Sequence, residues 1–335
     1  MPFDPDAAGQ PGSGIFGLPH TRADSRIVLL PVPFDATTSY GNGTAGGPAA
    51  IFDASVQVDL YDRRFGRIYE RGIFMEPESE RIAALSAATR KIAAPLIEKG
   101  GATGSDAAAV AKVNAAGEQV NAFTYEHTKR VLTEGKVPGL VGGDHSTPLG
   151  AIRACAEHTR GGLGILHIDA HMDLRDTYEG LTFSHASIML NVLKTIPQVI
   201  RLVQVGIRDF GEGEMDLGIE QGKRVHTFYD DQWAEATAGG TTFTDLAAAA
   251  IEQLPAQVYV SFDIDALDPS LCPHTGTPVP GGLSFNQAAL LLGALKESGK
   301  KIVGFDLVEV CPGPDDEWDA NVGARLLYKL CGLIG

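Results

Sequence analysis

Three apolar stretches of the chain end in clusters of histidine and aspartate, and this recurrence constrains the fold more than any other feature. The middle stretch, residues 163–168, leads into Asp169, His171 and Asp173. Residues two apart on a strand share a face, so Asp-x-His-x-Asp brings three potential metal ligands together. We therefore predict a buried strand whose end carries a site for a divalent metal.

The other two stretches end in the same way. Residues 137–141 run into Gly-Gly-Asp-His-Ser, and residues 257–262 run into Asp-Ile-Asp. Ligand sites in open α/β sheets lie beyond the carboxyl ends of parallel strands, so we expect all three ends to meet in one crevice. A single catalytic zinc usually takes three protein ligands, whereas two metals about 3.5–4 Å apart can share carboxylates. The predicted ligands suit two metals: His145, Asp169, His171, Asp173, Asp263 and Asp265.

The order of predicted elements indicates an α/β protein. From residue 136 onward, strands alternate with segments long enough for helices, which predicts a mostly parallel sheet covered on both faces. The predicted strands cover residues 26–31, 72–74, 137–141, 163–168, 199–205, 224–228, 257–262 and 301–306. The predicted helices cover residues 49–55, 78–99, 105–134, 149–158, 244–254 and 286–298. Pro95 is expected to kink or split one of them, and the Ala-rich residues 102–117 are interpreted as structural filling.

Composition favours one large domain. Hydrophobic residues make up 44% of the 335, ample for a core, and this length allows one large domain or two. Because nothing after residue 130 looks like a linker, residues 26–335 are predicted to form a single catalytic domain. Residues 1–25, acidic and rich in Gly and Pro near the start, are predicted to form an N-terminal arm without the features of a signal peptide. The four cysteines lack a CxxC spacing, which fits a reducing cytoplasm.

Charge and hydropathy narrow the partners. The net charge of −15 argues against a nucleic-acid partner and is compatible with a small cationic substrate. No apolar run reaches the roughly 18 residues that would predict a membrane span. The expected partner is therefore a small molecule.

The three ligand stretches resemble the motifs of a known family. GGDHS, DAHMD and SFDIDALDPS are similar to the three signature motifs of the ureohydrolases, the arginase family, and the similarity spans roughly residues 26–330. The resemblance implies a three-layer fold with about eight strands and a homo-oligomer, trimer or hexamer. It also implies hydrolysis of a guanidino compound to urea and an amine.

The same resemblance assigns the metal ligands. It implies that two carboxylates bridge both metals and that a histidine–aspartate pair completes each shell: Asp169 and Asp263 as bridges, His145 with Asp173, and His171 with Asp265. Two Mn²⁺ ions are the family's usual metals, although the spacing alone is also compatible with nickel, cobalt or iron. Two cations make hydroxide available near neutral pH.

Further residues match family positions with roles in catalysis. The resemblance implies that Asp173 passes a proton to the leaving nitrogen and that His185 shuttles protons at the pocket mouth. Glu309 would hold the guanidinium, and Thr277 would lie beside the scissile group. Many members have glycine after this histidine, where the chain has Ala186.

Several neighbouring residues are interpreted as supporting groups. His167 precedes Asp169 by two and is predicted to support the ligands or the core. Asp144 and Asp268 are predicted to orient ligands or turns. Asp209 and Asp306 are expected to act as structural hydrogen-bond acceptors, as are other polar groups near strand ends.

The sequence leaves the substrate tail open. Arginases have asparagine where this chain has Arg175 and an aspartate where it has Gly211, which makes arginine a less favoured substrate. Glu179 or Asp176 could meet a terminal ammonium, as in agmatine, whereas Arg175 could meet a carboxylate, as in guanidinobutyrate or guanidinopropionate. The opening at residues 33–51 tips the balance slightly to an agmatinase-like enzyme.

Other classes are less favoured. Guanidine and biguanides remain open as substrates, and formimidoylglutamase activity is less favoured. A single-zinc hydrolase on the related deacetylase fold lacks the full ligand set. A non-catalytic partner subunit usually loses a ligand or the guanidinium carboxylate, and this chain keeps all of them, Glu309 included.

Overall fold

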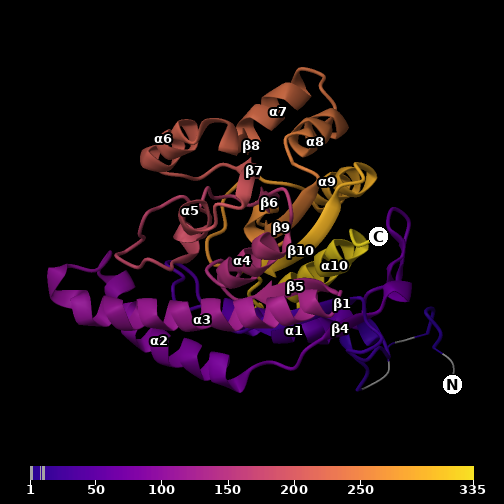
Figure 1. Cartoon of the computed structure of the whole chain (residues 1–335), viewed down its shortest axis with the longest axis horizontal. Coiled ribbons are helices and arrows are strands. Elements are labelled where there is room, and N and C mark those ends of the chain that lie inside the picture. Colours follow the sequence, from indigo (N-terminus) through magenta and orange to yellow (C-terminus); the bar gives the residue numbers. More distant parts are fainter. Residues whose placement is uncertain (1–2, 8, 10–11) are drawn as a thin grey trace.

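Within residues 3–7, 9 and 12–335, which the computed structural model describes, one eight-stranded sheet carries helices on both faces (Figure 1). Every pairing in this sheet is parallel. Across the sheet the order is β4 (Ile73–Met75), β1 (Ile27–Val32), β5 (Val137–Gly142), β10 (Lys301–Val308), β9 (Gln257–Asp263), β6 (Leu163–Ile168), β7 (Val199–Ile207) and β8 (Val225–Tyr229). The predicted three-layer, mostly parallel architecture is confirmed.

The helices form two groups that pack within themselves. One group is α2 (Glu80–Glu98), α3 (Ala107–Thr133), α4 (Leu149–His158) and α5 (Ile188–Thr195). The other is α1 (Gly47–Ser55), α8 (Phe243–Glu252), α9 (Phe285–Glu297) and α10 (Trp318–Gly332). Two more helices, α6 (Glu212–Glu220) and α7 (Asp230–Ala238), pack beside β8, and β2 (Tyr61–Asp62) pairs with β3 (Gly66–Arg67) in a separate hairpin.

The pattern of β6 shows why the sheet lies between two helical layers. Leu163 and Ile165 belong to the core that includes α4 and α5, whereas Leu166 and Ile168 belong to the core that includes α8, α9 and α10. Successive side chains of a strand point to opposite faces, so both faces of β6 are buried. Strands buried on both faces need continuous apolar sequence, which is the pattern that the sequence shows.

The eight predicted strands are all present, with ends within two residues of those expected. Of the two outcomes expected at Pro95, the split is wrong, because α2 runs through it to Glu98 as one helix, while the kink stays a prediction. Proline removes one N–H donor from the helix, and the buried neighbours Ala93, Leu96 and Ile97 keep this part of α2 packed in the core. Helices α5, α6, α7 and α10 were not predicted.

The segment before β1 is partly packed against the body. Positions 1, 2, 8, 10 and 11 of the predicted arm lie outside the described residues. Ile15 and Phe16 are buried, and the ring of Phe16 lies 4.8 Å from that of Tyr328 in α10. The backbone N–H of Phe16 also donates to Ser55 Oγ of α1 at 2.8 Å. The second half of the predicted arm is therefore part of the core, while the division into an arm and one catalytic domain stays a prediction.

Within the described part of the chain, no helix is both long and apolar enough to cross a membrane.

Close contact between α3 and α4 depends on a glycine, which gives a first prediction. A Cβ added to Gly150 in α4 would lie 2.0 Å from the carbonyl oxygen of Asn121 in α3. We expect Gly150→Ala to lower the free energy of unfolding by about 1–3 kcal/mol, because the two helices must separate. Denaturant titration followed by circular dichroism measures the effect.

A second glycine provides the matched control. Gly213 also lies in a helix, α6, but a Cβ there meets no atom within 4 Å. Gly213→Ala should raise stability by about 0.5–1 kcal/mol, since alanine loses less backbone entropy on folding. Equal effects of the two substitutions would contradict this account of the α3–α4 contact.

Candidate metal centre

Four neighbouring strands end at one edge of the sheet and carry the candidate ligands there. In the order β5, β10, β9, β6, the strands end at or just before His145, Glu309, Asp263 and Asp169. All four of these side chains are buried. Because parallel strands point the same way, residues that are far apart in sequence meet at this edge.

The first cluster of candidate ligands surrounds Nδ1 of His145, which has no hydrogen-bond partner among the described residues. Nδ1 of His145 lies 3.0 Å from Asp169 Oδ2, 3.0 Å from Asp173 Oδ2 and 3.2 Å from Asp263 Oδ2. None of these contacts has the geometry of a hydrogen bond. Three carboxylate oxygens around an imidazole nitrogen form a ligand set that suits a divalent cation.

The contacts of the other ring nitrogen of His145, Nε2, show which of the two nitrogens carries the proton. Nε2 lies 3.0 Å from Oγ of Ser261, and this hydroxyl donates to Asp306 Oδ1 at 3.0 Å. The hydroxyl proton is thus used on Asp306, so Ser261 accepts from Nε2–H. That arrangement assigns the proton to Nε2 and leaves the lone pair of Nδ1 for a metal.

The second cluster shares a carboxylate with the first. Nδ1 of His171 lies 3.0 Å from Asp265 Oδ2 and 3.5 Å from Asp169 Oδ1. Asp169 therefore presents Oδ2 to one histidine and Oδ1 to the other. Ligand atoms of Asp169, His171 and Asp265 lie close enough together to hold one ion. Asp169 could therefore serve two adjacent cation positions, because it belongs to both groups of neighbouring ligand atoms.

The carboxylates of the centre crowd negative charge in a buried space. Burial raises the pKa of Asp173 to about 6, and the neighbouring Asp169 adds to the effect. Burial, together with Asp265 and Asp169, raises the pKa of Asp263 well above its ordinary value. Buried charges without partners are costly, and cations between them remove that cost. The residues present therefore fit a pair of divalent metals.

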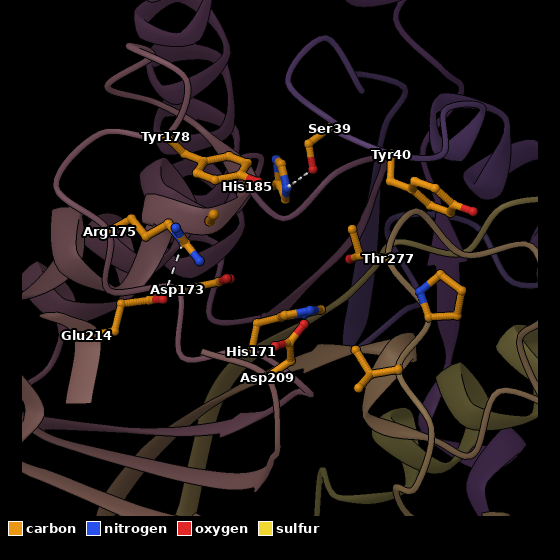
Figure 2. Close-up of a pocket in the computed structure, with 13 residues that line it drawn as sticks. Ser39, Tyr40, His171, Asp173, Arg175, Tyr178, His185, Asp209, Glu214 and Thr277 are labelled. Atoms are coloured by element: carbon orange, nitrogen blue, oxygen red, sulfur yellow. Dashed lines mark hydrogen bonds and ion pairs between the residues drawn. The ribbon is translucent and has the colours of Figure 1, made fainter. Parts of the chain in front are cut away.

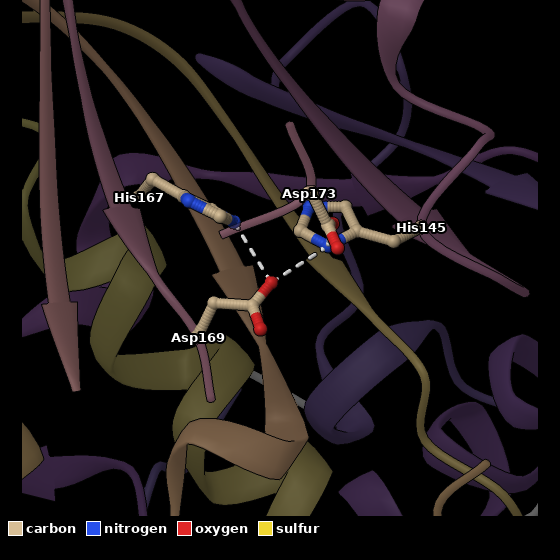
Figure 3. A group of neighbouring side chains, drawn as sticks. All are labelled: His145, His167, Asp169 and Asp173. Atoms are coloured by element: carbon tan, nitrogen blue, oxygen red, sulfur yellow. Dashed lines mark hydrogen bonds and ion pairs between the residues drawn. The ribbon is translucent and has the colours of Figure 1, made fainter. Parts of the chain in front are cut away.

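His167 lies behind Asp169 (Figure 3). Its Nε2 lies 2.8 Å from Asp169 Oδ2, and its Nδ1 accepts from the side-chain amide of Gln204 at 3.0 Å. Oε1 of Gln204 in turn accepts from Thr227 Oγ1 at 3.0 Å. This chain fixes the orientation of Asp169 from β7 and β8. Sequence reasoning missed Gln204 and Thr227, which lie inside strands and belong to no motif.

Asp144 connects the centre to the loop after β1. Its Oδ2 accepts from both the N–H and the hydroxyl of Thr37, at 3.0 and 2.7 Å. Thr37 Oγ1 also accepts from the N–H of His185 at 3.1 Å. One hydroxyl thus joins three segments, and this is an orienting role of the kind expected for Asp144.

A pocket of about 260 Å³ opens above the second cluster (Figure 2). Residues from four segments line it: Ser39, Tyr40, His171, Asp173, Arg175, Tyr178, His185, Ala186, Asp209, Glu214, Thr277, Pro278 and Val279. The structure thus brings the predicted substrate residues Thr277 and Arg175 to the same space as two metal-ligand candidates. Thr277 Oγ1 lies 3.4 Å from Asp265 Oδ2.

His185 forms part of the pocket wall. Its Nε2 lies 3.4 Å from Ser39 Oγ, and its ring packs edge-on against Tyr178 with centroids 5.7 Å apart. Burial, with the neighbouring His171, lowers the pKa of His185 to about 3. The imidazole is therefore neutral near pH 7.

Glu309 lies at the floor of the site rather than in the pocket wall. Its backbone has φ 62°, a left-handed conformation that is uncommon for residues other than glycine. Oε1 accepts from the N–H of His145 at 2.9 Å, whereas Oε2 is buried and has no hydrogen-bond partner among the described residues. Asp173 also has a positive φ, 55°. Strained backbone of this kind clusters at functional sites.

Glu179 and Asp176 do not line the pocket. Glu179 has φ 55°, and its carbonyl accepts from the N–H of Ala102, so its backbone is held against the α2–α3 connection. Asp176 is exposed and pairs with Lys194. The structure therefore brings neither candidate ammonium-binding carboxylate into this space.

The sequence model of the arginase family matches residues 25–332. This chain belongs to the arginase family. The N(1)-aminopropylagmatine ureohydrolase of Thermus thermophilus is 32% identical over 326 residues, which cover 96% of this chain and 94% of that protein. The guanidinobutyrase of Pseudomonas aeruginosa is 31% identical, with 95% of this chain and 91% of that protein covered. Proclavaminate amidino hydrolase of Streptomyces clavuligerus shares the fold at a TM-score of 0.72 and 25% identity, with 98% of each chain covered.

Substitution of Thr37, compared with substitution of a second buried threonine, Thr44, tests the role of Thr37 in this network. Thr37→Val should lower the free energy of unfolding by about 1–3 kcal/mol, because Asp144 loses a buried donor. In Thr44, Oγ1 is buried without a partner, so Thr44→Val should be neutral or stabilising. Unfolding midpoints of the two variants measure this, and similar losses in both would contradict the network.

Proposed function

We propose that this chain is a metal-dependent hydrolase that cleaves a guanidino compound to urea and an amine, agmatinase-like in its chemistry. The observation that supports it best is the bare Nδ1 of His145 facing three carboxylates, one of which also serves the second cluster. Relatives whose names include aminopropylagmatine ureohydrolase and guanidinobutyrase support the same reaction class.

The proposed ligand set is the one predicted from the sequence. Bridging carboxylates and two histidine–aspartate pairs would hold two Mn²⁺ ions: Asp169 and Asp263, His145 with Asp173, and His171 with Asp265. When bound, two divalent cations lower the pKa of a water toward neutrality and so supply a nucleophile. Mn²⁺ is proposed because oxygen ligands outnumber nitrogen ligands.

The remaining residues hold the substrate and move protons. Glu309 would accept hydrogen bonds from the guanidinium, for which its unpartnered Oε2 is available. Asp173 would take the proton of the nucleophile and give it to the leaving nitrogen. His185, which lies in the pocket wall, would carry protons between this site and solvent. Thr277 would contact the reacting end of the substrate.

Assembly and location are also proposals. We infer a homo-oligomer, trimer or hexamer, that acts in the cytoplasm on a small molecule, with neither nucleic acid nor membrane as partner. Light scattering at working concentration tests the assembly. The alternative is that the chain is a non-catalytic partner subunit. Release of urea by the purified chain would rule this out.

The two-metal assignment gives a prediction on composition. Elemental analysis of the Mn²⁺-loaded protein should find two ions per chain. Asp263→Ala should lose metal, the gain in thermal stability on adding Mn²⁺, and activity, because a bridging carboxylate is removed.

Asp268 is the matched control for this substitution. It belongs to the same motif, but its Oδ1 only accepts from Ser270, so Asp268→Ala should keep both metals. Active protein with a single metal per chain would overturn the binuclear proposal.

The role of Glu309 separates substrate binding from metal binding. Glu309→Gln should keep both metals and lower kcat/KM about tenfold to a hundredfold, because a charge-assisted hydrogen bond worth about 1.5–3 kcal/mol is lost. Glu317→Gln, at an exposed position on the same loop, serves as control. Loss of metal from Glu309→Gln, or unchanged kinetics, would refute the assignment.

A further inference from the structure

Arg175 is fixed at the wall of the pocket by three contacts. Its backbone N–H donates to the carbonyl of Ala186 at 3.1 Å. Its Nε lies 3.3 Å from Glu214 Oε2, and its guanidinium carbon lies 4.8 Å from the ring centroid of Tyr178 (Figure 2). The side chain remains 41% exposed, so it is held in place without being covered.

Glu214 is a buried anchor for this arrangement. Its Oε1 accepts from the N–H of Leu174 at 3.0 Å, and its Oε2 accepts from the N–H of Gly211 at 2.8 Å. Leu174 directly follows the ligand candidate Asp173, so one carboxylate ties this segment to the start of α6. Glu214 also lines the pocket, but both of its oxygens accept backbone N–H groups and Oε2 lies beside Arg175.

The outer end of the Arg175 guanidinium is free. Within the described part of the chain, Nη1 and Nη2 have no hydrogen-bond partner. A Cβ added to Gly211 would lie 3.8 Å from Nη2. Glycine at this position therefore leaves uncovered a nitrogen that a longer side chain could reach. A fixed guanidinium with two free donors is a geometry that recognises carboxylates.

We propose that Arg175, positioned by Glu214 and left uncovered by Gly211, is an anion subsite that selects guanidino acids over guanidino compounds with an ammonium tail. The inference rests on the proposed hydrolysis of a guanidino compound, and it assigns that reaction to a substrate with a carboxylate tail in place of the ammonium tail of agmatine. A preorganised cation costs little entropy on binding. The pocket places Arg175 beside the metal-ligand candidates His171 and Asp173, so the tail of a substrate whose reacting end lies at the metal centre would meet this guanidinium.

Asp209 is the charged group that argues for the opposite tail. It also lines the pocket, beside His171, and could receive an ammonium. It is exposed, and its carboxylate has no partner within the described residues, so it is solvated and not held in one orientation. We therefore assign the recognition of the tail to Arg175, and the experiments below test Asp209 as the alternative.

The first experiment compares substrates that differ only in the tail. For Mn²⁺-loaded protein, kcat/KM is measured on 4-guanidinobutyrate and on agmatine, and wild type should prefer the acid. Arg175→Ala should lower the ratio of the two values about tenfold to a hundredfold, mostly through KM for the acid. A preference of the wild type for agmatine would overturn the proposal. Loss of that preference in Asp209→Asn would assign the recognition of the tail to Asp209.

Gly211 offers a substitution that changes charge with little change in shape. Its φ of −84° and ψ of 153°, at the N-cap of α6, suit both Asp and Asn. Gly211→Asp places a carboxylate near Nη2 and should raise KM for 4-guanidinobutyrate about tenfold, whereas the matched Gly211→Asn should change it far less. Equal effects of the two variants would refute an electrostatic role.

Glu214→Gln tests positioning. The amide should disturb both Arg175 and the N–H donors, so KM for the acid should rise more than KM for agmatine. If Glu214 had only a structural role, KM for the two substrates would change equally. Circular dichroism confirms folding before the comparison.

Binding without metal separates this inference from the proposed function. Calorimetry of metal-free protein should show weak binding of 4-guanidinobutyrate that Arg175→Ala removes. If that binding is seen but no guanidino compound releases urea, the proposed function fails and the anion subsite stands. If agmatine is hydrolysed and Arg175→Ala neither weakens acid binding nor changes the substrate ratio, the subsite fails and the proposed function stands.

Discussion

The structure depends on the electrostatic cost of placing four aspartates and two histidines at one buried sheet edge. The raised pKa values of Asp173 and Asp263 show that this concentration of carboxylates is unfavourable without compensating cations. Hydrogen-bonded chains hold the ligands from behind: Ser261 and Asp306 behind His145, and His167 and Gln204 behind Asp169. The parallel sheet can hold the ligands in this arrangement, because four adjacent strands position them from rigid elements.

The supporting contacts also connect the metal centre with the pocket above it. Thr37 joins Asp144 to the backbone of His185, and Glu214 joins the segment after Asp173 to α6. The reacting end and the tail end of a substrate would thus meet groups held by a single network. The names of two relatives, an aminopropylagmatine ureohydrolase and a guanidinobutyrase, refer to guanidino compounds with different tails.

Much of the fold could be predicted from the sequence, because strands buried on both faces require apolar runs that differ visibly from their surroundings. All eight strands of the sheet and several helices were found in this way. The α2 helix showed the limit of a local rule, since it continues through Pro95, where its buried face packs in the core. Helices α6 and α7 were missed because they lie beside the edge strand β8 and bury little, so their apolar periodicity is weak.

The sequence by itself determined the identity of the candidate ligands, because each follows an apolar run, and those of Asp-x-His-x-Asp and Asp-Ile-Asp recur with a period of two. Only the tertiary structure decided which groups support or surround them. Gln204, Thr227 and Glu214 come from β7, β8 and α6, far from the motifs, and no local pattern marks them. It also turned Glu179 away from the pocket while leaving Arg175 in it, although the two residues are only four positions apart. Backbone conformation and contacts with distant segments set these orientations, and neither is encoded in residue spacing.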